Sequence, residues 1–303
     1  MDVYNIKEKK YDIAIAYRIY PKVSKKPYVY QKNKFKLAKL CLKSFKKSLG
    51  DLKAKVFVML DNCPNEYEEL FRSNFHEEEL EILKFNGIGN RATFNKQIDV
   101  LLNQDFSETI YFAEDDYFYL PNQFGKMLEF LKKYSEGVFI SPYDHPDYYS
   151  LDFHRNKHLV QAFNNRHWRS ANSTCLTFLT TKNVLIKTEK VFRTYTRGNL
   201  DSSVWLSLTK NNLFNPKLMI KFLLKEPFYI KSVMKSWTNC WRQILFGQKW
   251  KLWIPLPTIA THMDEIYLSP GIDWKAKINP EVEKIENEYQ KLVSSMSMGE
   301  NLS

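Results

Sequence analysis

Short apolar runs alternate with amphipathic stretches over the first 140 residues. Residues 12–17 (DIAIAY) are rich in strand-forming side chains, and residues 33–48 carry apolar side chains at helical spacing. The same alternation predicts strands over 55–60, 80–85 and 109–113, and helices over 65–75, near Pro64, and 91–104. Strands that alternate with helices favour right-handed βαβ crossovers, and therefore an α/β, Rossmann-like fold with a mostly parallel central sheet flanked by helices.

Beyond residue 140 the pattern loosens into polar and aromatic loops. A short strand over 174–180 and a helix over 202–210 are still predicted, and Pro121 and Pro280 suit the first turns of two further helices. We therefore expect a Rossmann-like part over 1–140, a looser part over 141–279, and a C-terminal helix and tail over 280–303.

Composition narrows the class of protein. The 303 residues are 44% hydrophobic and 15% aromatic with only nine glycines, which excludes wholesale disorder and collagen-like or glycine-rich architectures. The net charge of +11 favours anionic partners without choosing among nucleotides, acidic polymers and lipid headgroups. Four scattered cysteines, a charged N-terminus and no long apolar run lead us to expect a cytoplasmic protein, with peripheral contact at the inner membrane face left open.

Three consecutive carboxylates, Glu114, Asp115 and Asp116, directly follow the predicted strand at 109–113. Adjacent carboxylates repel one another unless a cation compensates them, and Mg²⁺ or Mn²⁺ prefers such oxygen ligands. The alternative is a solvated acidic loop that ends a strand. Arg18, Asp61 and Asn86 also lie where predicted parallel strands end, so one crevice could collect all of these side chains.

The run NGIGNRATFN (86–95) followed by YFAEDD (111–116) resembles, in order and spacing, nucleotide-sugar glycosyltransferases of the A-type (GT-A) fold, particularly the family 2-like group. The resemblance covers roughly residues 10 to 205, with a thinner extension to His262. Phe94 stands where that family usually has an arginine, and Glu114 where it usually has an aspartate.

The resemblance implies roles for individual residues. Glu114 would approach the donor ribose, Asp115 would support it, and Asp116 would bind a metal that bridges the diphosphate. Nucleotide-sugar contacts would also come from the strand ends and the 86–95 run, with Arg91 substituting for the missing arginine: Tyr17, Arg18, Asp61, Asn86, Arg91 and Asn95. Asp61 has an ordinary alternative as a turn residue ahead of Pro64.

Two sites farther along the chain complete this interpretation. Asp201 begins a predicted helix, where inverting members of the family carry the base that deprotonates the acceptor, although an aspartate there also suits a plain N-cap. His262 corresponds to the C-terminal histidine that completes the metal shell in many A-type enzymes, with Asp264 as the other candidate ligand.

The segment 236–257 is unusually rich in tryptophan and carries interleaved cations. It could be core, a sugar-stacking acceptor platform, or a membrane patch.

We expect a glycosyltransferase that needs Mn²⁺ or Mg²⁺ and moves a sugar from a nucleoside-diphosphate sugar to a hydroxyl of a glycan or lipid-linked acceptor. A single inverting displacement and a role in cell-surface polysaccharide synthesis are part of this expectation. The alternatives are a nucleotidyl- or phosphotransferase, although no P-loop motif occurs, and a basic nucleic-acid or membrane-surface binding module. No nucleic-acid signature is present, so nucleic acid is not the expected partner.

Overall fold

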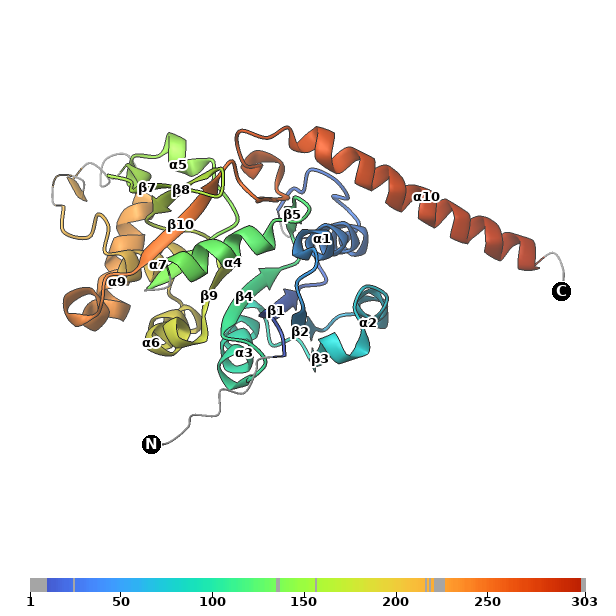
Figure 1. Ribbon diagram of the computed structural model, residues 1–303, viewed down its shortest axis with the longest axis horizontal. Helices are drawn as coiled ribbons and strands as arrows, with labels where there is room; N and C mark the ends of the chain where they lie inside the picture. The colour runs from blue at the N-terminus through green and yellow to red at the C-terminus, as the bar shows by residue number, and fades with distance from the viewer. Residues whose placement is uncertain are drawn as a thin grey trace.

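The computed structural model describes residues 10–23, 25–134, 137–155, 157–215, 217, 219–220 and 227–300, with no side-chain description for part of the last helix. Within these residues a nine-stranded sheet runs through the molecule in the order β3-β2-β1-β4-β9-β6-β10-β8-β7 (Figure 1). Its strands are β1 (Ile13–Ile19), β2 (Ala54–Asp61), β3 (Leu80–Phe85), β4 (Thr109–Glu114), β6 (Val138–Ile140), β7 (Val160–Phe163), β8 (Arg166–Ala171), β9 (Phe178–Thr181) and β10 (Lys251–Leu256).

The first four strands of the sheet pair in parallel, as the alternating pattern predicts. The strands β9, β8 and β7 then run antiparallel to their neighbours, whereas β6 and β10 pair in parallel. The sheet therefore continues across residue 140, and the division of the chain there stays a prediction. A separate antiparallel pair joins β5 (Tyr117–Tyr119) to β11 (Ala260–His262).

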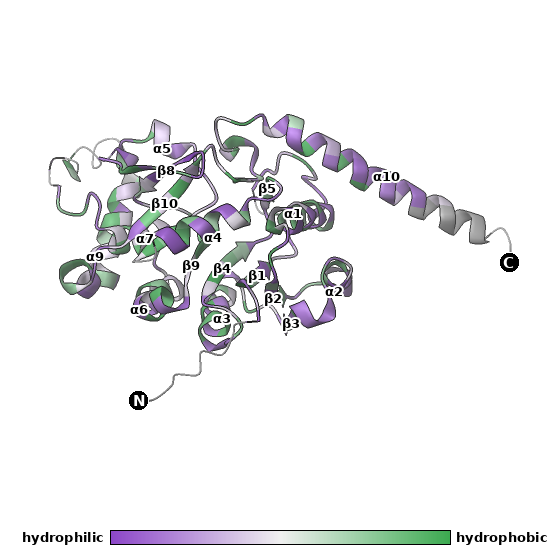
Figure 2. Cartoon of the chain, viewed as in Figure 1, coloured by the Kyte–Doolittle hydropathy of each residue, from purple (hydrophilic) through white to green (hydrophobic). Residues whose placement is uncertain are grey.

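Helices cover both faces of the sheet, which confirms the predicted α/β class. One face packs against α1 (Lys34–Leu49), α2 (Asn65–Arg72) and α4 (Phe124–Lys133). The other packs against α3 (Asn90–Asn103), α6 (Lys182–Phe192) and α7 (Asp201–Thr209). The central strands are apolar on both faces, as buried parallel strands must be, and Figure 2 shows them in green between helices of mixed hydropathy.

The remaining helices flank this body. They are α5 (Asp147–Ser150), α9 (Pro227–Phe246), α10 (Trp274–Glu300) and the short 3₁₀ turns η1 (Glu77–Glu79), η2 (Asp152–His154), η3 (Arg193–Arg197) and η4 (Glu265–Tyr267). Lysines of α1 pair with glutamates of α10, for example Lys36 with Glu286 at 2.7 Å and Lys43 with Glu288 at 2.6 Å. None of the described helices is both long enough and apolar enough to cross a bilayer.

Two proline predictions were wrong. The helix expected at Pro121 begins three residues later, at Phe124, and Pro280 lies inside α10 instead of starting it. The start of α10 combines a tertiary and a local interaction. Trp274 is buried, and the side chain of Asp273 accepts a capping hydrogen bond from the backbone N–H of Ala276 at 3.0 Å.

The tryptophan-rich segment is divided between core and surface. Trp250 and Trp253 are 4% and 2% exposed and pack in the two cores of the sheet, whereas Trp241 on α9 is 46% exposed. For Trp250 and Trp253 the core interpretation is therefore correct, and neither side chain forms an acceptor platform or a membrane patch.

Candidate functional site

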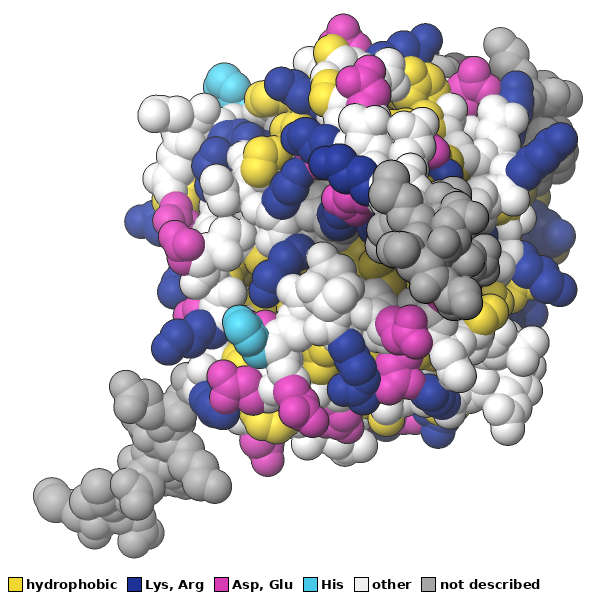
Figure 3. Space-filling view, turned by 90° about the vertical axis from the view of Figure 1, so that its right-hand side faces the viewer, with side chains coloured by type: hydrophobic (Ala, Val, Ile, Leu, Met, Phe, Trp, Pro, Cys, Tyr) yellow, Lys and Arg dark blue, Asp and Glu magenta, His cyan; other side chains and the backbone are white. Residues whose placement is uncertain are grey.

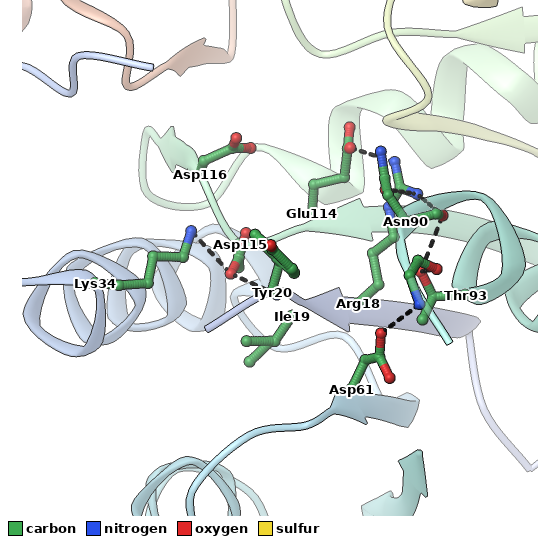
Figure 4. A pocket seen from close by; sticks show the side chains of 11 residues that line it. Arg18, Ile19, Tyr20, Lys34, Asp61, Asn90, Thr93, Glu114, Asp115 and Asp116 are labelled. Carbon is green, nitrogen blue, oxygen red and sulfur yellow. Dashed lines mark hydrogen bonds and ion pairs between the residues drawn. The ribbon is translucent and has the colours of Figure 1, made fainter. Parts of the chain in front are cut away.

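A cavity of about 330 Å³ lies at the carboxyl ends of β1, β2 and β4, where the sequence predicts the crevice (Figure 4). Ligands of open parallel sheets bind at such strand ends. Its lining brings together four of the predicted donor residues and one predicted metal ligand with residues that the sequence did not single out: Arg18, Ile19, Tyr20, Lys34, Asp61, Gly89, Asn90, Thr93, Glu114, Asp115 and Asp116.

Arg18 connects the strands to the opening of α3. Its guanidinium donates to the backbone and side-chain oxygens of Asn90 at 3.0 and 2.6 Å, and pairs with one oxygen of Glu114. The hydroxyl of Thr177 donates to the other oxygen of Glu114 at 2.6 Å. The ring of Phe94 lies 5.5 Å from the Arg18 guanidinium, so Arg18 occupies the space beside the position where the resemblance led us to expect an arginine.

Asp115 points away from Glu114 and Asp116, as Figure 4 shows, and is 6% exposed. One of its oxygens accepts from Lys34 Nζ at 2.9 Å and from the backbone N–H of Tyr20 at 3.1 Å. Burial raises the pKa of Asp115, and the Lys34 ammonium opposes that effect. Asp115 is therefore one half of a buried ion pair that fixes the acidic segment, which rules out a solvated loop at this position.

Asp116 meets His262 because β5 pairs with β11. The Cα positions of Tyr117 and His262 are register partners, and His262 Nε2 lies 3.1 Å from Asp116 Oδ2. His262 Nδ1 accepts from the backbone N–H of Asp264 at 3.0 Å, so the neutral ring carries its proton on Nε2, facing Asp116. Burial acts to raise the pKa of Asp116, but the attraction of His262, Lys34 and Arg18 outweighs it and lowers that pKa.

The other oxygen of Asp116, Oδ1, is buried and has no hydrogen-bond partner within the described part of the chain. A buried carboxylate oxygen without a partner is costly unless a cation or water completes it. Asp116 offers an oxygen ligand that suits Mn²⁺ or Mg²⁺. Both ring nitrogens of His262 are already hydrogen-bonded, so His262 adds a nitrogen ligand only if its ring gives up one of these bonds. In the described residues no group of three or more His, Cys, Asp or Glu side chains is placed to hold a metal, so substrate oxygens and water would have to complete the coordination shell.

Asp61 is engaged by the turn that follows β3. Its two oxygens accept from the backbone N–H groups of Ile88 and Gly89 at 2.8 and 2.7 Å, so its side chain holds the loop after β3 and not a local turn ahead of Pro64; the residue also lines the cavity. This carboxylate presents the backbone of 88–90 to the cavity, where Asn90 binds Arg18.

Four of the residues predicted to bind the donor lie outside the cavity. Tyr17 is 1% exposed and packs edge-on against Phe45 and Phe71, because it faces the opposite side of β1 from Arg18. The prediction of a nucleotide contact for Tyr17 is therefore wrong. The three others are on or before α3: Asn86 is exposed, Arg91 lies over the Tyr195 ring, and Asn95 accepts from Arg193 at 2.7 Å.

Asp201 lines a second pocket of about 160 Å³, together with His145, His154, Cys175 and Tyr229 among others. It is the first residue of α7 and not its N-cap, which is Leu200. Its Oδ1 accepts from the N–H of Ser202 at 2.6 Å. Burial raises the pKa of Asp201 while the Ser202 N–H opposes the shift, and the charge of Glu114 raises it further.

The segment 174–177 connects the two pockets. Thr174 and Cys175 line the second pocket, and Thr177, three residues after Thr174, binds Glu114 of the first. This segment was predicted as strand, but β9 begins only at Phe178. Burial lowers the pKa of His145 to about 3 and that of His154 to about 4, so both imidazoles are neutral near pH 7.

Asp264, the other candidate metal ligand, accepts from the N–H of Ile266 at 3.3 Å and caps the turn η4. Sequence reasoning missed Lys34, Tyr20, Asn90 and Thr177. Asn90 stood in the run quoted for the resemblance, whereas no local signal marked the other three residues.

Comparisons with known proteins add only distant likenesses. No family model matches the chain, and no curated protein matches it. Among solved structures, the chain is similar to a 4-diphosphocytidyl-2C-methyl-D-erythritol synthase from Anaerococcus prevotii (8% identity, 67% of this chain and 84% of that one, TM-score 0.39). It is similar also to S. aureus TarS 1-349 in complex with UDP (12% identity, TM-score 0.41, 65% of this chain and 54% of that one).

A third likeness is to the galactosyltransferase LgtC in complex with donor and acceptor sugar analogs (8% identity, TM-score 0.37, 73% of this chain and 82% of that one). The chain spans about half the length of the TarS chain. At this level of similarity the function has to be derived from the geometry of the two pockets.

Proposed function

We propose that the protein is a metal-dependent glycosyltransferase that binds a nucleoside-diphosphate sugar in the first pocket and the acceptor hydroxyl in the second. The observation that carries this proposal is the unpartnered, buried Oδ1 of Asp116 beside His262, at the rim of the cavity at the strand ends. Asp116 would hold Mn²⁺ or Mg²⁺, and His262 would join it once its ring releases one of its present hydrogen bonds. The metal, when bound, would offset negative charge on the departing diphosphate.

The chain's own residues would position the donor. Arg18 and Asn90 form a rigid polar wall, and Glu114 is held between Arg18 and Thr177, so its carboxylate has one orientation. A group fixed in this way pays little reorganisation cost when the ribose binds. Asp115 and Lys34 would not contact the donor. Their buried ion pair would hold residues 114–116 in place.

Asp201 would remove the acceptor proton. Its burial raises its pKa, which makes the carboxylate a stronger base than an exposed aspartate. In a single displacement the acceptor oxygen bonds to the anomeric carbon and its proton passes to Asp201. The bond from that carbon to the diphosphate oxygen breaks at the same time, and the nucleoside diphosphate leaves with the electron pair.

The first test is a thermal-shift panel of UDP-, GDP-, CMP- and dTDP-sugars, each with and without Mn²⁺ or Mg²⁺. A ligand that binds only the native state raises the unfolding temperature, so we expect a metal-dependent shift with one nucleotide. Folded protein that responds to none of them would contradict the proposal.

The nucleotidyltransferase alternative needs a separate measurement, because it uses a similar crevice. Such an enzyme would release pyrophosphate from a nucleoside triphosphate and a sugar phosphate. Pyrophosphate release that depends on Asp116, without transfer or hydrolysis of any nucleotide sugar, would favour that alternative.

A further inference from the structure

The C-terminal end of α9 carries an exposed apolar surface that no described element covers. Trp241, Leu245 and Phe246 are 46%, 50% and 79% exposed, and Phe246 lies edge-on to Trp241 with ring centres 6.3 Å apart. The guanidinium of Arg242 lies 5.3 Å from the Trp241 ring. We call these four residues the α9 patch. Adjacent exposed apolar side chains of this size mark interaction sites more often than single exposed ones do.

The sequence around the α9 patch contains no negative charge. From Pro227 to Met263 there is no Asp or Glu, whereas five cations occur in that interval: Lys231, Lys235, Arg242, Lys249 and Lys251. Lys235 is engaged by the backbone oxygen of Gly198, and Arg242, Lys249 and Lys251 are exposed. Residues 13–50 also lack Asp and Glu, but lysines of α1 in that stretch pair with glutamates of α10, and the face shown in Figure 3 carries both signs of charge.

This combination matches the chemistry of an anionic bilayer surface. Indole and phenyl rings insert at the level of lipid headgroups, while arginine and lysine beside them bind phosphates. Each cation near an anionic surface adds to the attraction, which falls off within a Debye length. A nucleic acid would attract the cations equally well, but it offers no apolar layer for the aliphatic Leu245 or the largely exposed Phe246.

The first part of α9, before a kink at Cys240, borders the second pocket, and the α9 patch follows that kink. Phe228 and Tyr229, at the start of α9, line that pocket together with Asp201. The α9 patch and these pocket residues are therefore joined by a single 20-residue segment, Pro227–Phe246.

We propose that the α9 patch docks the protein on anionic lipid bilayers. The docking itself does not depend on the proposed glycosyl transfer, so it can be tested without any sugar substrate. Binding would hold the second pocket close to the lipid surface, where an acceptor carried on a lipid is concentrated.

The test is co-sedimentation of the full chain with vesicles of phosphatidylcholine alone, and of phosphatidylcholine with phosphatidylglycerol. We expect binding only to the mixed vesicles, weakening as salt rises. W241S/F246S should lower affinity by removing inserted rings, and R242E/K249E should lower it by roughly tenfold or more because two cations become anions. Both variants should keep the thermal unfolding temperature of the unaltered protein, since the changed side chains are exposed.

Matched controls are L159S/V160S, which removes two exposed apolar side chains on and beside β7, and K132E/K133E, which reverses two exposed cations on α4. Both control variants should bind the mixed vesicles as the unaltered protein does. Failure to bind these vesicles, or equal losses in controls and patch variants, would overturn the proposal. Patch-dependent binding to an oligonucleotide but not to vesicles, or patch-dependent self-association in place of vesicle binding, would overturn it in favour of those partners.

Discussion

Carboxylates in the two pockets differ in how fully they are hydrogen-bonded and paired with charges. In the first, Glu114 and Asp115 are each bound by a cation and a second donor, and their positions are fixed before any ligand arrives. In the second, Asp201 accepts from one backbone N–H of its own helix turn, and burial raises its pKa. A fully paired carboxylate is suited to orienting a ligand, whereas a buried carboxylate with little compensation is suited to accepting a proton.

Asp116 stands between these two cases. One oxygen meets His262, and the other is buried without a partner among the described residues. If this contrast reflects function, changes at the four carboxylates should have separable effects on turnover, binding and stability.

The largest effect should come from Asp116→Asn. We expect a loss of roughly 10³-fold in metal-dependent turnover, because a bound divalent cation contributes several kcal/mol of charge stabilisation. Turnover would be followed as nucleoside diphosphate release at saturating Mn²⁺, with circular dichroism to establish that the fold is intact. The control Asp51→Asn changes an exposed carboxylate and should be neutral. Full activity of Asp116→Asn would remove the metal from the proposal.

Asp201→Asn should lower kcat by roughly 10²-fold, at the lower end of the range for loss of a general base. Donor binding in the thermal-shift assay should not change, because Asp201 lines the other pocket. Equal loss of donor binding would show that the two pockets do not divide the substrates as proposed.

The pH dependence of Asp201 has a definite sign. Because its pKa is raised in the folded protein, kcat should fall as the pH drops through that raised value, when the base becomes protonated. The same shift means that the ionised form destabilises the fold at higher pH, so Asp201→Asn should raise the unfolding temperature at pH 7 and not at pH 3. A lower unfolding temperature at pH 7 would contradict this account of the pocket.

Lys34→Met should destabilise the fold by about 3 kcal/mol, because it leaves the buried Asp115 carboxylate without its partner. The double variant Lys34→Met with Asp115→Asn should recover part of that loss, since the uncompensated charge is gone. Urea unfolding of the two variants measures both values. Additive losses in the double variant would mean that the pair is not coupled.

The smallest effect should come from Thr177→Val. It removes the hydroxyl that orients Glu114, at a cost of about 1 kcal/mol for one hydrogen bond. We expect this loss to appear as a higher KM for the donor, with kcat nearly unchanged. A change confined to kcat would move Glu114 from donor orientation to the chemical step.

Much of the first half of the fold could be predicted from local pattern. The strand predicted over 80–85 is observed as Leu80–Phe85, and the helix predicted over 33–48 as Lys34–Leu49, because apolar spacing and neighbouring turn residues fix both elements. The acidic residues at the end of β4 could also be predicted to line a crevice, because parallel strands bring their carboxyl ends to one edge of the sheet.

The second half of the fold depended on pairing between segments that are distant in the sequence. The antiparallel course of β9 and β8, the burial of Trp253 and the inclusion of Pro280 within α10 all follow from contacts with segments far away in the sequence. Tyr17 shows the same limit of sequence-based prediction at a single residue. Strand alternation places Tyr17 and Arg18 on opposite faces of β1, but only the packing of Tyr17 against Phe45 and Phe71 shows that its face is the core.

The sequence by itself determined the order of strands and helices in the first half, the chemistry available at the strand ends and the absence of acidic residues around α9. The tertiary structure decided which of those groups meet. His262 comes to lie 3.1 Å from Asp116, although 146 positions separate them, only because β11 pairs with β5. Asp115 is paired and buried only because α1 places Lys34 beside it. The secondary-structure propensity of a local segment does not predict these side-chain contacts, because they depend on which distant segments pack their apolar faces together.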